Sequence, residues 1–224
     1  LCDGKKTIPF ASSQDHKARD NNDLGPNTGG MGAYSPAPIV TEEIHKQVME
    51  KIIKPTIDGL KSEGITYKGF LYAGLMIKNS EISVLEFNCR FGDPETQPIL
   101  MRMESDLAEI CLLAAQGNLN EREISWTKDS ALGVVIASKG YPFEYEKNKE
   151  INNLENENSR QKVFHAGTKT QEGKVLSNGG RVLCVTALGS TLLDSKNLAY
   201  QKVKNIDWKD GFYRDDIGDK AIKS

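Results

Sequence analysis

The sequence has little of several features that would point to particular classes of function. Its four cysteines, spread over 224 residues, lack the paired spacing of a zinc site or a disulfide framework. Its 29 Lys and Arg are balanced by 31 Asp and Glu, which gives a formal net charge of −2. No apolar run approaches the length of about 18 residues that a membrane helix needs. These features argue against nucleic acid and membrane partners, and unpaired cysteines predict a reducing, cytoplasmic compartment.

The segment Val84–Glu95 is the most informative part of the chain. Its first residues are β-branched, aliphatic or aromatic and predict a strand, and its Gly and Pro predict a loop at the end. Side chains alternate along a strand, so Glu86 and Asn88 are expected on one face, about 7 Å apart at the backbone. Leu85 and Phe87 are then expected to point the other way, into a core.

Glu86, Asn88 and Arg90 together suit a divalent cation that carries phosphate. Mg²⁺ prefers oxygen ligands, and Arg is a common partner of phosphate groups. A Glu-x-Asn pair on a strand is more often a solvated face than a metal site. What favours the metal site here is a second polar block upstream in the sequence.

That upstream block has two parts. Asp15, His16 and Lys17 place an acid, an imidazole and a cation side by side, although a polar hairpin end would explain them equally well. The stretch from Gly25 to Pro38 contains four Gly and three Pro without apolar periodicity, so we expect a long loop. Glycine allows positive φ and close approach of the backbone to a ligand. No Gly-Lys-Ser/Thr closes the stretch, so it is not a Walker loop.

Taken together, four segments resemble the phosphoribosylamine–glycine ligase family of the ATP-grasp superfamily. They are Ser13–Lys17, Gly25–Pro36, Gly69–Met76 and Arg90–Gln97. Two later segments, Phe164–Thr168 and Asn178–Leu183, resemble the C-terminal domain of that family. The resemblance covers essentially the whole chain.

The resemblance implies ligation of glycine to 5-phosphoribosylamine at the expense of ATP, through glycyl phosphate, in purine biosynthesis. Glu86 and Asn88 match the family's ligands for Mg²⁺ or Mn²⁺, and Arg90 would act as the catalytic residue that holds the transferred phosphate. The residues expected to bind or shape the pocket for glycine and phosphoribosylamine are Asp15, His16, Lys17, Asn27, Thr28, Gly29, Gly30, Asp93 and Glu95. The partners expected are therefore small molecules.

Two departures from the family matter. The chain begins at Leu1, inside what reads as a strand, whereas members of the family are longer. The part that clamps adenine would lie outside this sequence, so we expect the fragment alone to be inactive. The stretch Tyr72–Leu75 also offers no further carboxylate. A second Mg²⁺ would then depend on Glu86, nucleotide phosphates and water.

The expected fold class is α+β, in two domains. Residues 1–125 would form the C-terminal portion of an ATP-grasp fold, a mostly antiparallel sheet backed by helices. Residues 126–224 would form a small strand-rich domain with one helix. The expected helices are 41–64, 98–116 and 191–206. The expected strands are 69–77, 81–88, 130–138, 162–168, 174–177 and 181–188, with a hairpin over 1–11 and a solvated insertion over 144–160.

Two rival functions remain open at this stage. One is a non-catalytic module that binds magnesium and phosphate. The other is a different ATP-grasp enzyme, such as a carboxylase that uses bicarbonate. The segments Asp15–Lys17 and Asp93–Glu95 favour an amine-binding site over a carboxylase site.

Overall fold

The computed structural model describes residues 1–120, 122–155 and 158–223. Its contacts divide the chain into two compact units, neither of which is continuous in sequence. Unit 1 consists of Leu1–Ser12, Ala37–Gly92 and Met103–Trp126, and unit 2 consists of Ser13–Pro36, Asp93–Arg102 and Thr127–Ser224. Residues 13–36 and 93–102, which a single boundary near residue 125 assigns to the first domain, pack within unit 2.

Unit 2 is built on a six-stranded antiparallel sheet. The strand order is β10-β13-β9-β5-β2, and β14 pairs with β9 beside this path. The strands are β2 (Gln14–Asp15), β5 (Gly32–Ser35), β9 (Ser130–Ser138), β10 (Gln161–His165), β13 (Arg181–Gly189) and β14 (Gly211–Phe212). The central strands β9 and β13 are long and rich in small and β-branched residues, as the sequence predicts for buried strands.

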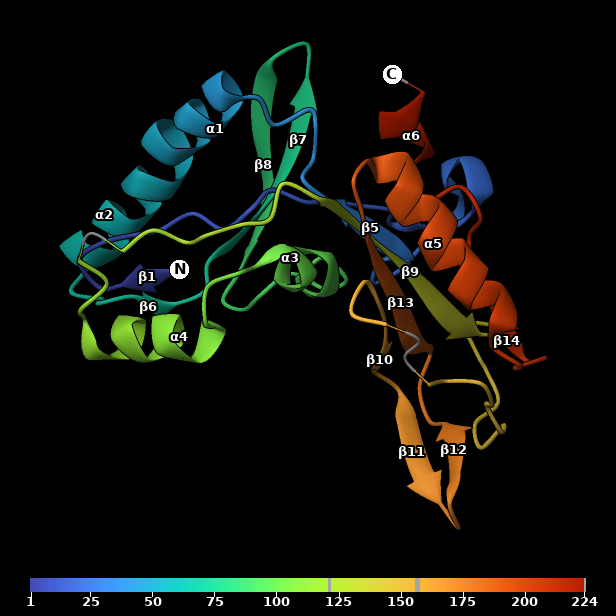
Figure 1. The fold of residues 1–224 in the computed structure, drawn as a ribbon. Helices are drawn as coiled ribbons and strands as arrows, with labels where there is room; N and C mark the ends of the chain where they lie inside the picture. The colour runs from blue at the N-terminus through green and yellow to red at the C-terminus, as the bar shows by residue number, and fades with distance from the viewer. Residues whose placement is uncertain (121, 156–157, 224) are drawn as a thin grey trace. The chain divides into compact units, whose positions relative to one another are not determined.

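Two helices cover the two faces of this sheet (Figure 1). Alternation along β9 turns Leu132 and Val134 into the core cluster that includes Ala199 and Val203 of α5 (Leu192–Asn205). The other face of β9 carries Gly133, next to Pro98 of α3 (Thr96–Arg102). The central strands are therefore covered on both faces, by α5 on one side and by α3 on the other.

The Gly25–Pro38 stretch is partly a strand, which differs from the expected long loop. β4 (Leu24–Asn27) pairs with β3 (Ala18–Asp20) around the short 3₁₀ turn Asn21–Asp23. β5 is fully buried between β9 and β2. Gly32 allows this, because a Cβ there would lie 2.6 Å from the carbonyl oxygen of Gly133.

Unit 1 contains two strand pairs and the remaining longer helices. β1 (Cys2–Asp3) pairs with β6 (Lys68–Gly69), and β7 (Tyr72–Lys78) pairs with β8 (Glu81–Asn88). α1 (Glu42–Val48) continues through a π-helical turn (Met49–Ile53) into α2 (Lys54–Ser62), and α4 is Leu107–Gln116. The side chain of Thr41 accepts a hydrogen bond from Ile44 N and caps α1. A small core gathers Leu1, Ile8, Ile110, Ala114 and Leu119.

Three further expectations differ from the structure in whole or in part. The predicted helix over 98–116 is two helices, because Asp106 caps a new one by accepting from Glu109 N. The predicted hairpin over 1–11 is present in a short form: Leu1 and Ile8 exchange backbone hydrogen bonds at 2.8 Å, and β1 also pairs with β6. Leu85 and Phe87 are exposed, at 63% and 41%, because the sheet of β7 and β8 has only two strands in the described chain.

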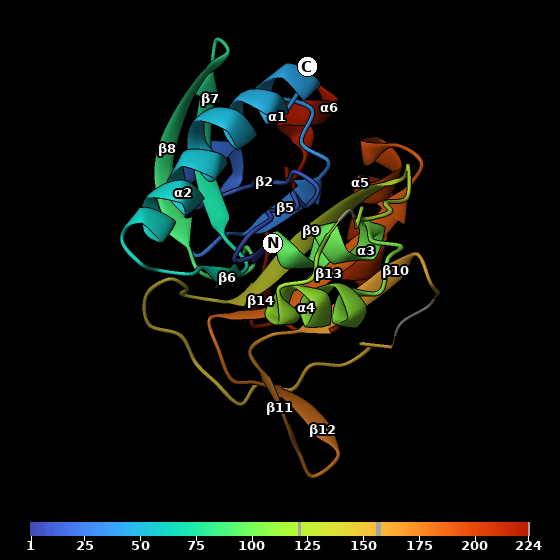
Figure 2. The ribbon, with the colours of Figure 1, turned by 90° about the vertical axis from the view of Figure 1, so that its left-hand side faces the viewer.

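A second hairpin extends from the end of the sheet in unit 2. β11 (Thr168–Gln171) pairs with β12 (Lys174–Ser177), and Figures 1 and 2 both show it projecting beyond β10 and β13. The polar stretch over 144–160 is mostly exposed, but its Ile151 is buried in the core. Residues 156–157 of this stretch lie outside the described residues. The last described helix is α6 (Asp219–Ile222). None of the described helices is long and apolar enough to cross a membrane.

Candidate functional site

Glu86 and Asn88 lie on β8 in unit 1. Antiparallel pairing sets Glu86 opposite Gly74 and Asn88 opposite Tyr72. The two side chains share a face of the strand, as the spacing predicts. In the described part of the chain, neither takes part in a hydrogen bond or an ion pair. A Cβ on Gly74 would lie 3.0 Å from Cγ of Glu86, so glycine opposite Glu86 leaves room for its side chain.

The positions and oxygen donors of Glu86 and Asn88 suit a hard cation. Two oxygen-bearing side chains on one face, both uncommitted, can complete their ligation with water and phosphate, as Mg²⁺ prefers. Among the described residues, no group of three or more His, Cys, Asp or Glu could hold a metal by itself. Glu86 and Asn88 therefore fit a cation that shares its ligands with a phosphate-bearing substrate, and they do not form a closed protein cage.

Arg90 follows β8 in the same unit and is exposed. Its Nη1 donates to the carbonyl oxygen of Phe91 at 2.8 Å. The ring of Phe91 packs on those of Phe10 and Phe70, with centroids 5.3 and 4.6 Å away. This aromatic cluster fixes the backbone after Arg90, while the guanidinium stays accessible to a ligand.

The other candidate residues belong to unit 2, where the two upstream blocks pair with each other. The N–H of His16 donates to the carbonyl oxygen of Gly32, and that of Met31 donates to the carbonyl oxygen of His16. Both the amide and the hydroxyl of Thr28 donate to the carbonyl oxygen of Lys17, at 2.8 Å each. Two segments that the sequence analysis singled out separately therefore form one ladder.

Within this ladder the polar side chains differ in exposure. Asp15 pairs with Lys17 at 2.8 Å, and the Lys17 side chain is 45% exposed. Asn27 is also exposed. His16 is buried: Gly218 N donates to Nε2 at 3.3 Å, and Nδ1 lies 3.3 Å from the carbonyl oxygen of Gly32. Both ring nitrogens therefore interact with backbone groups. His16 supports the backbone of the ladder and is not exposed to a ligand.

Burial lowers the pKa of His16, and the nearby Arg214 guanidinium lowers it further. Arg214 is itself buried and pairs with Asp23 at 3.1 Å and with Asp216 at 2.8 Å. Burial of Asp216 raises its pKa, but hydrogen bonds from Arg214 and Asn22 N and the positive charge outweigh this and leave it lowered. The cluster thus keeps His16 neutral and the two aspartates charged.

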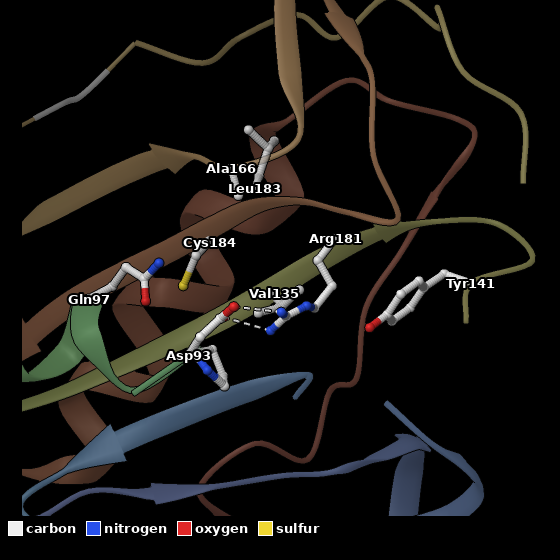
Figure 3. Close-up of a pocket in the computed structure, with 9 residues that line it drawn as sticks. Asp93, Gln97, Val135, Tyr141, Ala166, Arg181, Leu183 and Cys184 are labelled. Carbon is white, nitrogen blue, oxygen red and sulfur yellow. Dashed lines mark hydrogen bonds and ion pairs between the residues drawn. The ribbon is translucent and has the colours of Figure 1, made fainter. Parts of the chain in front are cut away.

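Asp93 is held by a residue that the sequence analysis did not select. Nη1 and Nη2 of Arg181 each donate to one oxygen of the Asp93 carboxylate, at 2.7 Å (Figure 3). Nη1 also donates to the carbonyl oxygen of Gly29 at 2.7 Å. Arg181 therefore joins the Gly-rich segment to the loop that carries Asp93. Glu95, two residues on, is buried.

The glycines around Arg181 are required by close packing. A Cβ on Gly29 would lie 2.7 Å from Cζ of Arg181, and one on Gly30 would overlap the ring of Pro94. The N–H of Gly29 donates to the hydroxyl of Tyr141 at 3.0 Å. In the sequence, Asn178–Arg181 at the start of β13 stands out only through the family resemblance. Its two glycines before an arginine were the available signal for a close approach.

The candidate residues thus fall into two groups, one in each compact unit. Glu86, Asn88 and Arg90 belong to unit 1, and the structure gathers the ladder residues, Asp93 and Glu95 in unit 2. Arg181, Tyr141 and Gln97 join the second group. They come from segments far apart in sequence.

Comparison of the sequence with models of known protein families identifies two matches. The family model for the phosphoribosylglycinamide synthetase ATP-grasp (A) domain matches residues 1–96. The model for the phosphoribosylglycinamide synthetase C domain matches residues 131–220. The fold and these matches define an ATP-grasp protein of the α+β class, which confirms the predicted fold class. The chain belongs to the phosphoribosylglycinamide synthetase family.

Individual relatives agree with this family. The phosphoribosylamine–glycine ligase of Allochromatium vinosum is 56% identical over 224 residues, a match that covers 99% of this chain and 52% of that protein. The ligase of the same name from Salmonella typhimurium is 54% identical, with 100% of this chain and 53% of that protein covered. The chain therefore spans about half the length of the curated relatives it matches.

Solved structures show the same fold. The phosphoribosylamine–glycine ligase of Thermotoga maritima matches with a TM-score of 0.87 and 33% identity, covering 96% of this chain and 53% of that one. The urea amidolyase of K. lactis matches with a TM-score of 0.67 at 14% identity, over 94% of this chain and 12% of that one. The second match shows a shared fold alone.

Proposed function

We propose that the full-length protein containing this chain is a phosphoribosylamine–glycine ligase. It would join glycine to 5-phosphoribosylamine with release of ADP and phosphate, as a step of purine biosynthesis in the cytoplasm. The observation that carries the proposal is the pair of uncommitted oxygen donors, Glu86 and Asn88, followed by the accessible Arg90, in a chain of this family.

The reaction would proceed in two displacements. The glycine carboxylate attacks the γ-phosphorus of ATP, ADP leaves, and glycyl phosphate forms. The amine nitrogen of phosphoribosylamine then attacks the acyl carbon, and phosphate leaves with its electron pair while the nitrogen loses a proton. Both steps build negative charge on phosphoryl oxygens, so preorganised positive charge near them lowers both barriers.

The proposed roles follow from the donor types. Glu86 and Asn88 would hold Mg²⁺ or Mn²⁺, which supplies charge neutralisation to the phosphates of ATP. Arg90 would hold the transferred phosphate, for which the planar guanidinium offers two parallel donors. Asp93 and Glu95 would face the amines. The ladder of Asp15–Lys17 with Asn27–Gly30 would shape the pocket for glycine and phosphoribosylamine.

The test is ADP release by the full-length protein with Mg²⁺, ATP, glycine and phosphoribosylamine, omitting one component at a time. Strict dependence on all of them supports the ligase. Release that needs bicarbonate in place of glycine would identify a carboxylase. Absence of release under every combination, with ATP and Mg²⁺ still bound, would leave a binding module and overturn the proposal.

A further inference from the structure

A cavity of about 270 Å³ lies within unit 2, on the face of the sheet that α3 covers. Its walls come from the loop before α3, from α3 itself, from β9 and the segment after it, and from β13. Figure 3 shows Gln97 on one side, the Asp93–Arg181 pair in the middle and Tyr141 beyond Arg181. The rest of the lining is mostly apolar, with Val135 and Leu183 among it.

The guanidinium of Arg181 is not an open receptor for an anion. Both terminal nitrogens donate to Asp93, at 2.7 Å each, and Nη1 donates to the carbonyl oxygen of Gly29. The Arg181 side chain is only 21% exposed, whereas that of Asp93 is 51% exposed. The pair is neutral as a whole, and the carboxylate is its more accessible half. Arg181 thus fixes the direction of the Asp93 carboxylate.

Gln97 supplies a second acceptor. Its Oε1 is shielded from solvent and accepts no hydrogen bond from any residue of the described chain. A buried acceptor without a donor is costly, and native structures usually satisfy it through a ligand, a water or an unusual functional role. Gln97 Oε1 has no donor, whereas each Asp93 oxygen already accepts from Arg181 but keeps a further lone pair on a half-exposed carboxylate. A ligand that brings N–H groups would donate to both.

We propose that Asp93 and the Oε1 of Gln97 form the subsite for the amino group of a substrate, and that Arg181 is a positioning residue for it. The ligand class is a small primary amine, either as ammonium or as free amine. This inference rests on the proposed function, in which both glycine and phosphoribosylamine carry such a group. An amine brings two or three N–H donors, enough to satisfy both acceptors.

The test is steady-state kinetics of the full-length protein with Gln97→Met, Gln97→Glu and Asp93→Asn. Gln97→Met keeps the length of the side chain and removes the acceptor, so KM for one amine should rise roughly 10-fold while KM for ATP stays unchanged. Gln97→Glu restores an acceptor and should recover most of that loss. Varying glycine and phosphoribosylamine in turn shows which amine uses the subsite.

The direction in which Asp93→Asn changes KM shows whether the subsite binds an amine or an anion. It removes the negative charge at nearly constant shape, so KM for the amine should rise. If the subsite instead binds an anion through Arg181, loss of the competing carboxylate should lower KM for that substrate. An unchanged KM for both amines in Gln97→Met, or a lower KM in Asp93→Asn, overturns the inference.

Arg181→Lys tests the positioning role. Lysine keeps the charge but loses the planar fork, so KM for the amine should rise with little change in KM for ATP. Arg160→Lys is the matched control, since Arg160 pairs with Asp129 at 2.7 Å elsewhere in unit 2. Gln201→Met, at an exposed position on α5, controls for Gln97→Met. Both controls should retain wild-type constants.

Failure of the proposed function can be distinguished from failure of this inference. If the wild-type protein releases ADP without glycine, the ligase assignment falls. The subsite is then judged by calorimetric titration of glycine into wild type and Gln97→Met. Glycine binding that weakens roughly 10-fold in Gln97→Met supports the subsite, and equal or absent binding in both overturns it.

Discussion

At the scale of single residues, Gly30 determines how closely the Gly-rich segment packs. Its φ is +111°, in a region that other residues rarely adopt, and a Cβ there would overlap the ring of Pro94. Gly30→Ala should therefore displace the segment and the Arg181–Asp93 pair that contacts it. We expect KM for glycine or phosphoribosylamine to rise at least about 10-fold, because a 1 Å misplacement can cost more than that.

Gly173 offers the matched control for this prediction. It also has positive φ, +76°, but nothing lies within 4 Å of a Cβ there. Gly173→Ala should cost only backbone strain, about 1 kcal/mol of stability, and leave kinetic constants unchanged. Equal kinetic effects of the two substitutions would show that strain, rather than contact with Pro94, governs the segment.

The proposed role of Glu86 as a ligand of Mg²⁺ can be tested by substitution. Glu86→Gln keeps the shape of the side chain and removes its charge, so affinity for Mg²⁺ should fall and turnover should fall by orders of magnitude. The measurement is ADP release by the full-length protein as a function of Mg²⁺ concentration. Glu81→Gln, an exposed carboxylate on the same strand, is the control. A near-normal rate and Mg²⁺ dependence for Glu86→Gln would remove it from the metal site.

The candidate site was predictable only where its residues are close in sequence. The period of two along β8 placed Glu86 and Asn88 on one face without further information. Arg181 and Gln97 were not selected, because their roles depend on contacts with Gly29, Asp93 and the cavity that only the folded sheet creates. A single sequence carries no local signal for such contacts.

At the scale of elements, helix ends were predictable because capping is local. Thr191 precedes α5 and forms a capping box: Asp194 N donates to its hydroxyl, and its own N–H donates to the Asp194 carboxylate, each at 3.1 Å. The predicted strand β9 and the α5 helix agree with the structure within a residue or two. β5 was missed because its burial depends on pairing with β9, a strand about a hundred residues later.

Thr191→Ala should destabilise α5 by about 1 kcal/mol, because it removes the acceptor for Asp194 N. Since α5 packs on β9 and β13, hydrogen exchange of amides in all three elements should accelerate together. Thr170→Ala, at an exposed position on β11, serves as the control and should leave exchange in α5 unchanged. Unaltered protection of α5 in Thr191→Ala would show that packing alone sets this helix end.

At the scale of the whole molecule, the two compact units interleave along the chain. A boundary near residue 125 follows from composition, but composition cannot show that residues 13–36 and 93–102 pack with the C-terminal part. Sheet pairing decides that: β2 and β5 extend the sheet of β9 and β13. The chain therefore cannot be cut at one point into its two units.

His16 connects the beginning of unit 2 to its end: its ring accepts a hydrogen bond from Gly218 N, 202 residues later in the chain. The charged groups around it are Arg214, Asp216 and Asp23. Its pKa in the folded protein is lowered from 6.5, chiefly by burial, so the unfolded chain binds the proton more readily. The stability that neutral His16 provides is therefore complete above pH 6.5 and is lost as pH falls below it toward the folded pKa.

Between pH 7 and 5, the free energy of unfolding should fall by up to about 1.4 kcal/mol per pH unit below 6.5. The aspartates with lowered pKa lose their contributions only at more acidic pH, because their ordinary value is 3.8. Exchange of β9 amides across this pH range, corrected for intrinsic rates, measures the effect. The pH dependence should disappear in His16→Gln and persist in His165→Gln, at an exposed position. A slope that survives His16→Gln would assign the pH dependence to another group.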